Sequence, residues 1–239
     1  FKQKTAYEIS LGLVGSEMCI RDRNNPSGVL YGDETLLEMS KIIQEKEDEF
    51  GIEIYLVSDE PYRKIIFDGI EYPHIFNYHK RSIVATSHSK DLALPGERIG
   101  YIAVNPDCPD VEEILDGLVF CNRTLGFVNA PALIQYLVAH LQGTTIDVGV
   151  YEKKRDYLYK ALTDMGYSLI KPQGAFYMFP KSPTEDDVQF TEELKGNRVL
   201  VVPGRGFGLP GYFRISYCLD DATIEGSLSG LGKAISAYK

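Results

Sequence analysis

The chain contains 239 residues, of which 44% are hydrophobic and 25% are charged, values close to the average for a globular protein. This composition excludes a disordered tail, a collagen-like fibre and a membrane channel, and no apolar run approaches the roughly 20 residues that span a bilayer. Acidic residues outnumber basic residues by 34 to 25, which gives a formal net charge of −9. Because a surface of this sign repels phosphate backbones and the Lys and Arg residues do not cluster, we expect neither nucleic acid nor a membrane as a partner.

Residues 1–23 differ in character from the rest of the chain. They carry basic residues at both ends and a short apolar middle, which is too short for a secretory signal. The segment closely resembles the translated read-through of a sequencing adapter; a natural amphipathic N-terminal segment is the alternative. We predict that it is an artefact outside the fold, in which Ile9, Leu11 and Leu13 pack on no core. The genuine chain would then begin near Asn24, with its own N-terminal part missing.

The first predicted element of the genuine chain is a helix. Pro26 and Gly28 lie in Asn25-Pro26-Ser27-Gly28, a pattern that is typical of a turn. Asp33 can cap the helix that follows, in which apolar residues recur at helical spacing. We expect this helix to end near Gly51.

Three strands are predicted next, over 54–57, 82–86 and 98–104. The first two are short, continuous apolar runs, which is typical of parallel strands buried on both faces. Each run ends in polar residues, at Ser58-Asp59 and at Ser87 to Lys90. Because open α/β sheets bind ligands at the carboxyl ends of their parallel strands, these polar residues are candidates for a site.

The remaining sequence predicts helices and then a change of fold type. Helix signals occupy 109–121, 129–142 and 147–165. Beyond Gly166, short strands alternate with two helices. The predicted strands there span 168–171, 175–179, 199–202 and 212–217, and the predicted helices span 185–195 and 220–237. The sequence therefore predicts an α/β unit followed by an α+β unit.

The four cysteines are scattered, and no C-x-x-C pair occurs. They are Cys19, Cys108, Cys121 and Cys218. We expect reduced thiols in a cytoplasmic protein. The four histidines have no spacing that indicates a metal site, so no metal is expected.

Ser87-His88-Ser89-Lys90, eight residues before Arg98, permits three interpretations. Lys90 could be a solvated loop lysine. Ser87 and Lys90 also match the S-x-x-K signature of some serine hydrolases, but the companion S-D-N and K-T-G motifs are missing from the sequence. In the third interpretation, Lys90 is the Schiff-base lysine of a pyridoxal phosphate enzyme.

Several motifs together resemble the class I/II aminotransferases of pyridoxal-phosphate fold type I, from Asn24 to the C-terminus. Each motif is weak alone, but they occur in the family's order and at plausible separations. They are Asn25-Pro26-Ser27-Gly28, Asp59-Glu60-Pro61-Tyr62, Ser87-His88-Ser89-Lys90 with Arg98, and Phe213-Arg214-Ile215-Ser216. Gly174-Ala175-Phe176-Tyr177 and the stretch from Val202-Pro203-Gly204 to Gly208 add to the resemblance.

The resemblance implies a role for each candidate residue. Lys90 is the catalytic residue, which holds pyridoxal 5′-phosphate through a Schiff base and carries the proton from the substrate Cα. Asp59 pairs with the pyridine nitrogen and so keeps the ring an electron sink.

Further implied roles concern the rest of the cofactor and the substrate. Asn25 and Tyr62 contact the phenolate oxygen of the cofactor. The phosphate lies on Arg98, Ser87 and Ser89. Arg214 binds the α-carboxylate of the substrate in a bidentate geometry that lysine cannot supply.

The resemblance also implies a domain organisation and partners. We expect part of a large cofactor-binding domain over 24–143, with a mostly parallel sheet flanked by helices, and a small α+β domain over 144–239. The implied activity is transamination between an L-amino acid, with a leaning toward aspartate, and a 2-oxo acid, in a homodimer when the chain is full length. A β-lyase or decarboxylase of the same fold type, or a non-catalytic fragment, is the alternative.

Overall fold

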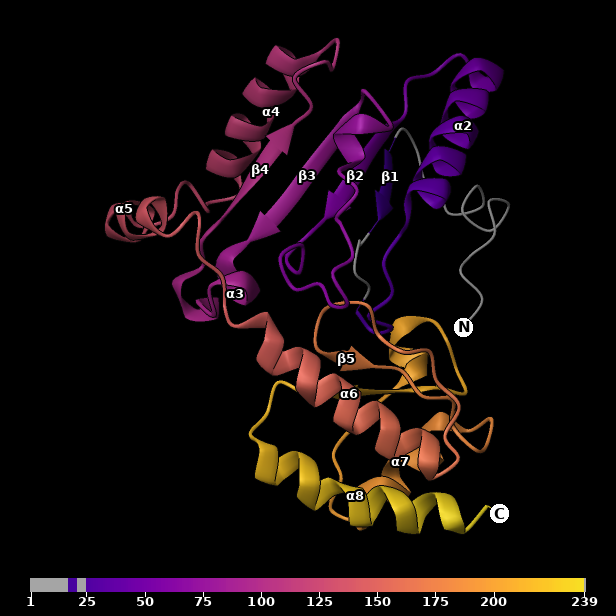
Figure 1. Ribbon diagram of the computed structural model, residues 1–239. Coiled ribbons are helices and arrows are strands. Elements are labelled where there is room, and N and C mark those ends of the chain that lie inside the picture. Colours follow the sequence, from indigo (N-terminus) through magenta and orange to yellow (C-terminus); the bar gives the residue numbers. More distant parts are fainter. Residues whose placement is uncertain (1–16, 21–24, 239) are drawn as a thin grey trace.

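Two β-sheets organise residues 17–20 and 25–238, which are the residues that this computed structural model describes. Figure 1 shows a four-stranded sheet in its upper part and a three-stranded sheet among helices in its lower part. The predictions for Ile9, Leu11 and Leu13 lie outside the described residues.

The four-stranded sheet has the order β1-β2-β3-β4. Its strands are β1 (Glu17–Ile20), β2 (Tyr55–Asp59), β3 (Ser82–Ser87) and β4 (Gly100–Val104). β1, β2 and β3 are parallel, and β4 runs antiparallel to β3. The expected mostly parallel sheet is therefore confirmed. A short 3-10 turn, η1 (Ile75–Asn77), precedes β3.

Helix α2 (Asp33–Phe50) packs on this sheet through one apolar face. Leu36, Met39 and Ile43 from the helix join Leu56 of β2 and Ile75 in a buried core. The prediction that Asp33 caps the helix is wrong. Gly32 is the N-cap residue, and no side-chain cap bond is formed. Asp33 is already helical, and its carboxylate accepts a hydrogen bond from the Tyr78 hydroxyl instead.

The prediction that residues 1–23 lie outside the fold is wrong for residues 17–20. These four residues form β1 and pair in parallel register with Tyr55 to Ser58. Ile20 is buried with the core between the sheet and α2. The pairing satisfies backbone groups along one edge of β2, which a buried sheet edge requires.

The strand predicted over 98–104 begins at Gly100. Arg98 adopts a left-handed conformation with φ of 50°, which an extended strand cannot include. It ends a short 3-10 turn, η2 (Pro95–Glu97), so the backbone reverses before β4 begins.

The three-stranded sheet is antiparallel and has the order β5-β7-β6. Its strands are β5 (Tyr177–Met178), β6 (Val202–Pro203) and β7 (Phe213–Ser216). Around it lie α6 (Val148–Asp164), α7 (Asp187–Gly196) and α8 (Asp221–Ser236). The strand predicted over 168–171 is not formed. Ser168 accepts one backbone hydrogen bond from Lys181, and Pro172 offers no N–H to continue a ladder.

The segment after β2 packs against the three-stranded sheet, although β2 itself belongs to the four-stranded sheet. Tyr62, Ile65 and Phe67 belong to a core built mainly from residues 158–235, which we call the second core. The fully buried Arg155 of α6 holds this segment by two hydrogen bonds to the Asp68 carboxylate, at 2.6 and 2.9 Å. The contact places the residues that follow β2 between the two sheets.

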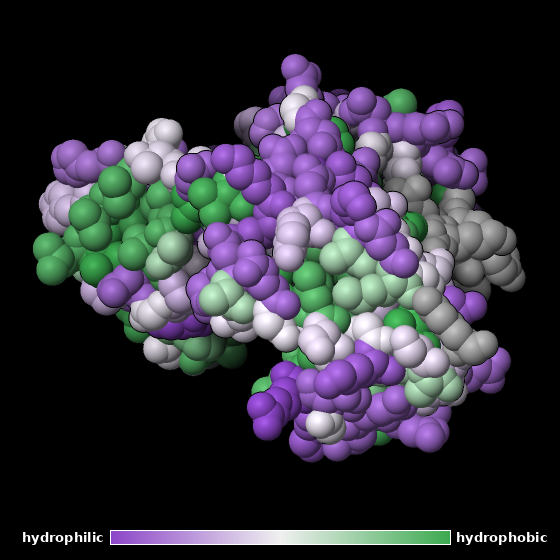
Figure 2. Space-filling view, turned by 60° about the horizontal axis from the view of Figure 1, so that its bottom comes forward, coloured by the Kyte–Doolittle hydropathy of each residue, from purple (hydrophilic) through white to green (hydrophobic). Residues whose placement is uncertain are grey.

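Helices α4 (Val111–Thr124) and α5 (Ala132–His140) carry a large exposed apolar surface. Phe127 between them is 75% exposed and Leu133 of α5 is 78% exposed. Figure 2 shows hydrophobic residues gathered on this side of the molecule, at the left. We call the exposed set the α4–α5 face; it comprises Leu115, Val119, Phe120, Leu125, Phe127, Val128, Leu133, Tyr136 and Leu137. No helix in the described part of the chain has the length and apolar character needed to cross a membrane.

Candidate active site

A pocket of about 360 Å³ lies at the carboxyl ends of the parallel strands β2 and β3. Six of the eight predicted site residues line it: Asp59, Tyr62, Ser87, Ser89, Lys90 and Arg98. Pro61, Ala85, Thr86 and Pro95 complete the lining. The pocket lies where open parallel sheets bind their ligands, outside the carboxyl ends of the strands.

Strand geometry brings Asp59 to the pocket. Side chains alternate between the faces of a strand, so Asp59 points away from the face on which Ser58 is fully buried. Asp59 pairs in register with Ala85 of β3. The next residues are fixed by a hydrogen bond of 2.7 Å from the Glu60 N–H to the Ala85 carbonyl and one of 2.9 Å from the Thr86 hydroxyl to the Glu60 carbonyl.

Lys90 stands on the four-residue helix α3 (His88–Asp91), directly after β3. Its Nζ lies 5.6 Å from the ring centroid of Phe176 and 6.0 Å from that of Tyr62. Within the part of the chain that the structure describes, the Lys90 ammonium makes no hydrogen bond and no ion pair. The amine is therefore available to a ligand in the pocket.

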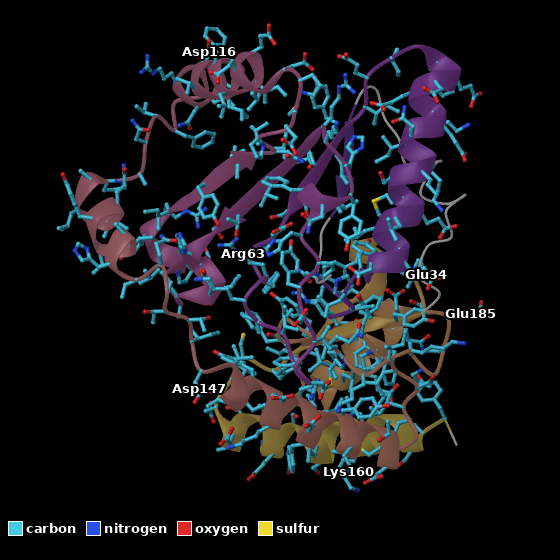
Figure 3. All side chains as sticks on the ribbon, turned by 45° about the horizontal axis from the view of Figure 1, so that its top comes forward. Glu34, Arg63, Asp116, Asp147, Lys160 and Glu185 are labelled. Carbon is cyan, nitrogen blue, oxygen red and sulfur yellow. The ribbon has the colours of Figure 1, made fainter. Side chains whose placement is uncertain are left out.

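Contacts of Asp91 with neighbouring segments hold the helix that carries Lys90. The His88 ring nitrogen Nδ1 lies 3.2 Å from an Asp91 carboxylate oxygen, and both side chains are almost fully buried. Lys64 Nζ lies 3.5 Å from the same carboxylate. The Asp91 carbonyl accepts a hydrogen bond of 2.8 Å from the Ile146 N–H, just before α6 begins. Figure 3 shows Asp147 at that entry to α6, where its carboxylate caps the helix by accepting from the Gly149 N–H.

Ser87, Ser89 and Arg98 are among the residues that line the pocket. Arg98 is exposed and donates a hydrogen bond of 3.0 Å from Nη1 to the Pro95 carbonyl. Two hydroxyls and a guanidinium form a donor set that suits a phosphate. With the carboxylate of Asp59 and the amine of Lys90 in the same lining, the chemistry of the set fits pyridoxal 5′-phosphate.

Asn25 and Arg214 do not line this pocket, but they contact each other. Nη1 of Arg214 donates a hydrogen bond of 2.6 Å to the Asn25 side-chain oxygen. Nε of Arg214 is buried and has no hydrogen-bond partner among the described residues. A buried guanidinium edge without a partner is costly in a folded chain, so it marks a place for an anionic ligand.

Two aromatic residues around Arg214 were given no role in the sequence-based assignments. The guanidinium carbon lies 4.6 Å from the ring centroid of Tyr177 and 4.7 Å from that of Phe207. Both residues belong to stretches that carried the family resemblance, which was the only signal for them. The Tyr177 hydroxyl also lies 3.0 Å from that of Tyr62 in the pocket lining, so the pocket and the Arg214 site are joined by a hydrogen bond.

Arg63 is a further cation near the pocket, but it is no part of the lining. Figure 3 shows it beside the four-stranded sheet. Its guanidinium carbon lies 5.5 Å from the Tyr101 ring centroid. It therefore provides a nearby positive charge with which Arg98 can be compared.

Comparison with known proteins identifies the family. The model of the family described as aminotransferase class I and II matches residues 17–231. The chain belongs to this family. Membership supports the aminotransferase interpretation of the Ser87 to Lys90 motif over the hydrolase one, and it confirms the predicted fold class.

Individual aminotransferases resemble the chain over most of its length. A probable aspartate aminotransferase from Methanocaldococcus jannaschii is 33% identical over 213 residues, which cover 86% of this chain and 54% of that protein. An aromatic-amino-acid aminotransferase from Thermococcus litoralis is 29% identical, with 93% of this chain and 58% of that protein covered. The crystal structure of an amino transferase from Eubacterium rectale has a TM-score of 0.94 and 40% identity, covering 98% of this chain and 59% of that one. The chain thus spans little more than half the length of these aminotransferases.

Proposed function

We propose that this chain is part of an aminotransferase that moves an amino group between an L-amino acid and a 2-oxo acid with pyridoxal 5′-phosphate as cofactor. The observation that carries the proposal is the meeting of Lys90, Asp59 and Arg98 at one pocket at the ends of two parallel strands. An amine, a carboxylate and a guanidinium are the three groups that this cofactor needs at its aldehyde, its ring nitrogen and its phosphate. An acidic amino acid such as aspartate is the proposed donor, in keeping with the relative from Methanocaldococcus jannaschii.

Different residues would hold the different chemical groups of the cofactor. Arg98, Ser87 and Ser89 would bind the phosphate, and Lys90 would bond covalently to the aldehyde carbon. Asp59 would keep the ring nitrogen protonated, while Tyr62 and Asn25 would contact the ring oxygen. When bound, pyridoxal 5′-phosphate supplies an electron sink next to the substrate Cα.

Lys90 Nζ would serve as the proton carrier at the substrate Cα. It lies to one side of the Tyr62 and Phe176 rings, with no competing acceptor among the described residues. The short helix that carries it is held by the contacts of Asp91 with Lys64 and Ile146, so its amine is held in place at the end of β3. A held amine lowers the entropic cost of proton transfer.

Arg214 would bind the α-carboxylate that all amino-acid substrates share. Asn25 occupies Nη1, which leaves the edge formed by Nε and Nη2 for the carboxylate oxygens. Two parallel hydrogen bonds to one carboxylate would also orient the Cα–H bond toward Lys90.

Assembly, domain division and location are part of the proposal. The α4–α5 face supports a homodimer of the full-length protein, since apolar patches of this kind are typical of interfaces. Phe127→Glu and Leu133→Glu should then lower the sedimentation coefficient, while Leu200→Glu, at an equally exposed site away from the face, should not.

We also propose a large domain over 24–143, a small domain over 144–239, and a cytoplasmic location.

Covalent labelling tests the central assignment. The chain is incubated with pyridoxal 5′-phosphate, reduced with borohydride and digested, and the labelled peptide is identified by mass spectrometry. We expect the label on Lys90, and its loss in Lys90→Ala but not in Lys80→Ala, which changes an exposed lysine outside the pocket lining. Label on another lysine would refute the site. Product analysis with an added 2-oxo acid then separates transamination from β-elimination or decarboxylation.

A further inference from the structure

The guanidinium of Arg214 lies between two aromatic side chains, Tyr177 and Phe207, which we call the aromatic pair. Its central carbon is almost equally far from the two ring centroids, at 4.6 and 4.7 Å. Tyr177 is anchored in the second core and by its hydroxyl contact with Tyr62. Phe207, in contrast, is only half-buried and stands on a surface turn, so something else must hold it against Arg214.

The turn that carries Phe207 is the 3-10 turn η3 (Gly204–Phe207). Gly204 begins it in close contact with a neighbouring loop, since a Cβ there would lie 2.3 Å from the Leu209 carbonyl oxygen. Arg205 is bound at two points by one carboxylate. Its backbone N–H donates to Asp187 Oδ2 at 2.8 Å, and its Nε donates to Oδ1 at 3.0 Å.

Asp187 is suited to anchor this turn. It is the first residue of α7, and its side chain is fully buried. Burial alone would raise the pKa of this carboxyl, but the hydrogen bonds from Arg205 and the Arg205 charge outweigh it and lower the pKa. The carboxylate is therefore ionised near neutral pH and fully engaged with Arg205, two residues before Phe207.

We propose that Asp187 and Phe207 are positioning residues for substrate binding: Asp187 fixes the turn, and the turn holds Phe207 against the guanidinium of Arg214. The inference rests on the proposed role of Arg214 as the carboxylate-binding residue. A guanidinium held between two rings loses rotational freedom before the ligand arrives, so less entropy is lost on binding. Contact with the two rings also leaves the buried Nε without a hydrogen-bond partner among the described residues.

Nuclear magnetic resonance of the arginine Nε–Hε groups in the full 239-residue chain tests the inference. The Arg214 signal is identified by its loss in Arg214→Lys. Its ring-current shift and heteronuclear NOE report, without any ligand, whether the guanidinium is stacked and rigid. Titration with butanoate, a simple carboxylate, then gives a dissociation constant, and butan-1-ol serves as the uncharged control.

Two pairs of matched variants separate positioning from general structure. Phe207→Leu should remove the ring-current shift, lower the NOE and weaken butanoate binding by roughly tenfold, and Phe207→Tyr should restore all three. Asp187→Asn should weaken binding by roughly fivefold. Asp186→Asn is its control, because Asp186 contacts Arg205 only through an exposed ion pair and asparagine caps a helix equally well.

The outcomes distinguish this inference from the proposed function. A wild-type chain whose Arg214 signal does not respond to butanoate overturns the carboxylate role of Arg214 and, with it, the positioning role. A wild-type chain that binds butanoate, with Phe207→Leu unchanged in NOE and affinity, overturns the positioning role alone. If Asp187→Asn fails to fold, the comparison of Phe207→Leu with Phe207→Tyr still shows whether Phe207 positions the Arg214 guanidinium.

Discussion

The side-chain oxygen of Asn25 accepts a hydrogen bond of 2.6 Å from Nη1 of Arg214, although 189 positions separate the two residues in the chain. Asn25 follows the first strand region, and Arg214 lies in β7 of the three-stranded sheet. The bond joins the turn before α2 to the central strand of the three-stranded sheet. It also decides which edge of the guanidinium a substrate can reach, and several expected outcomes follow from this geometry.

Arg214→Lys should weaken amino-acid binding and slow turnover together. Lysine keeps the positive charge but loses the bidentate geometry, so we expect a loss of about 2–4 kcal/mol in transition-state stabilisation. The measurement is kcat/KM in a full-length enzyme, for an amino acid and for the matching amine without its α-carboxylate. Equal penalties on both compounds would show that Arg214 has a structural role only.

Arg98→Ala should release the cofactor rather than the substrate. Removing the guanidinium from the pocket should raise the dissociation constant for pyridoxal 5′-phosphate by a factor of about 10 to 100, as expected for a lost charge-assisted contact. Fluorescence titration measures it. Arg63→Ala is the matched control, because Arg63 is a nearby cation outside the pocket lining. Similar losses in the two variants would point to a general charge effect.

Asp59→Ala should leave the cofactor bound but slow removal of the substrate Cα proton. Without the carboxylate the ring nitrogen loses its proton, and we expect a decrease of about a hundredfold or more, roughly 2.7 kcal/mol of barrier. Exchange of the Cα hydrogen with deuterated solvent measures this step directly. Ser58→Ala, one residue earlier on the opposite face of β2, should exchange at the normal rate. Normal exchange in Asp59→Ala would remove this residue from its assigned role.

Gly100→Ala should disturb the pocket by displacing the end of β3, which lines it. A Cβ at this position would lie 2.2 Å from the Thr86 carbonyl oxygen and 3.0 Å from the Ser87 Cα, so the end of β3 must move. We expect a stability loss of about 1–3 kcal/mol together with weaker cofactor retention. Denaturant unfolding and cofactor titration measure the two effects. Gly96→Ala has open space around its Cβ and should change neither.

Asp68→Asn should destabilise the chain at neutral pH more than in acid. The hydrogen bond from Arg155 is the main reason why the pKa of the Asp68 carboxyl lies below its ordinary value. A carboxyl with a lowered pKa contributes stability above its unfolded pKa of about 4 and loses it as the pH falls through the folded value.

We expect a cost of about 1–2 kcal/mol at pH 7, less than for a fully buried pair because the Asp68 side chain is 43% exposed. Urea unfolding of both proteins at pH 7 and pH 3 measures it, and the difference between them should shrink at pH 3. Asp164→Asn, in the exposed pair with Lys160, should show no such difference. A cost for Asp68→Asn that is the same at both pH values would contradict the ionic explanation.

Local patterns in the sequence were sufficient to predict most elements and much of the pocket. The apolar runs that end in Asp59 and in Ser87 to Lys90 predicted two buried parallel strands with polar carboxyl ends, and register in the sheet places these residues side by side. These features could be predicted because a strand and the turn after it are encoded within about ten residues. The rule that parallel sheets bind ligands at the carboxyl ends of their strands then predicts where the pocket lies.

The tertiary structure alone decided the contacts between distant segments. No spacing in the sequence indicates that Asn25 bonds Arg214, that the Phe207 ring lies against its guanidinium, or that residues 17–20 complete the sheet as β1. Likewise, the left-handed Arg98 and the missing strand at 168–171 depend on what each segment meets in space. Such contacts close loops of many residues and form only because the surrounding core offsets the entropy of closure, so a local pattern carries no record of them.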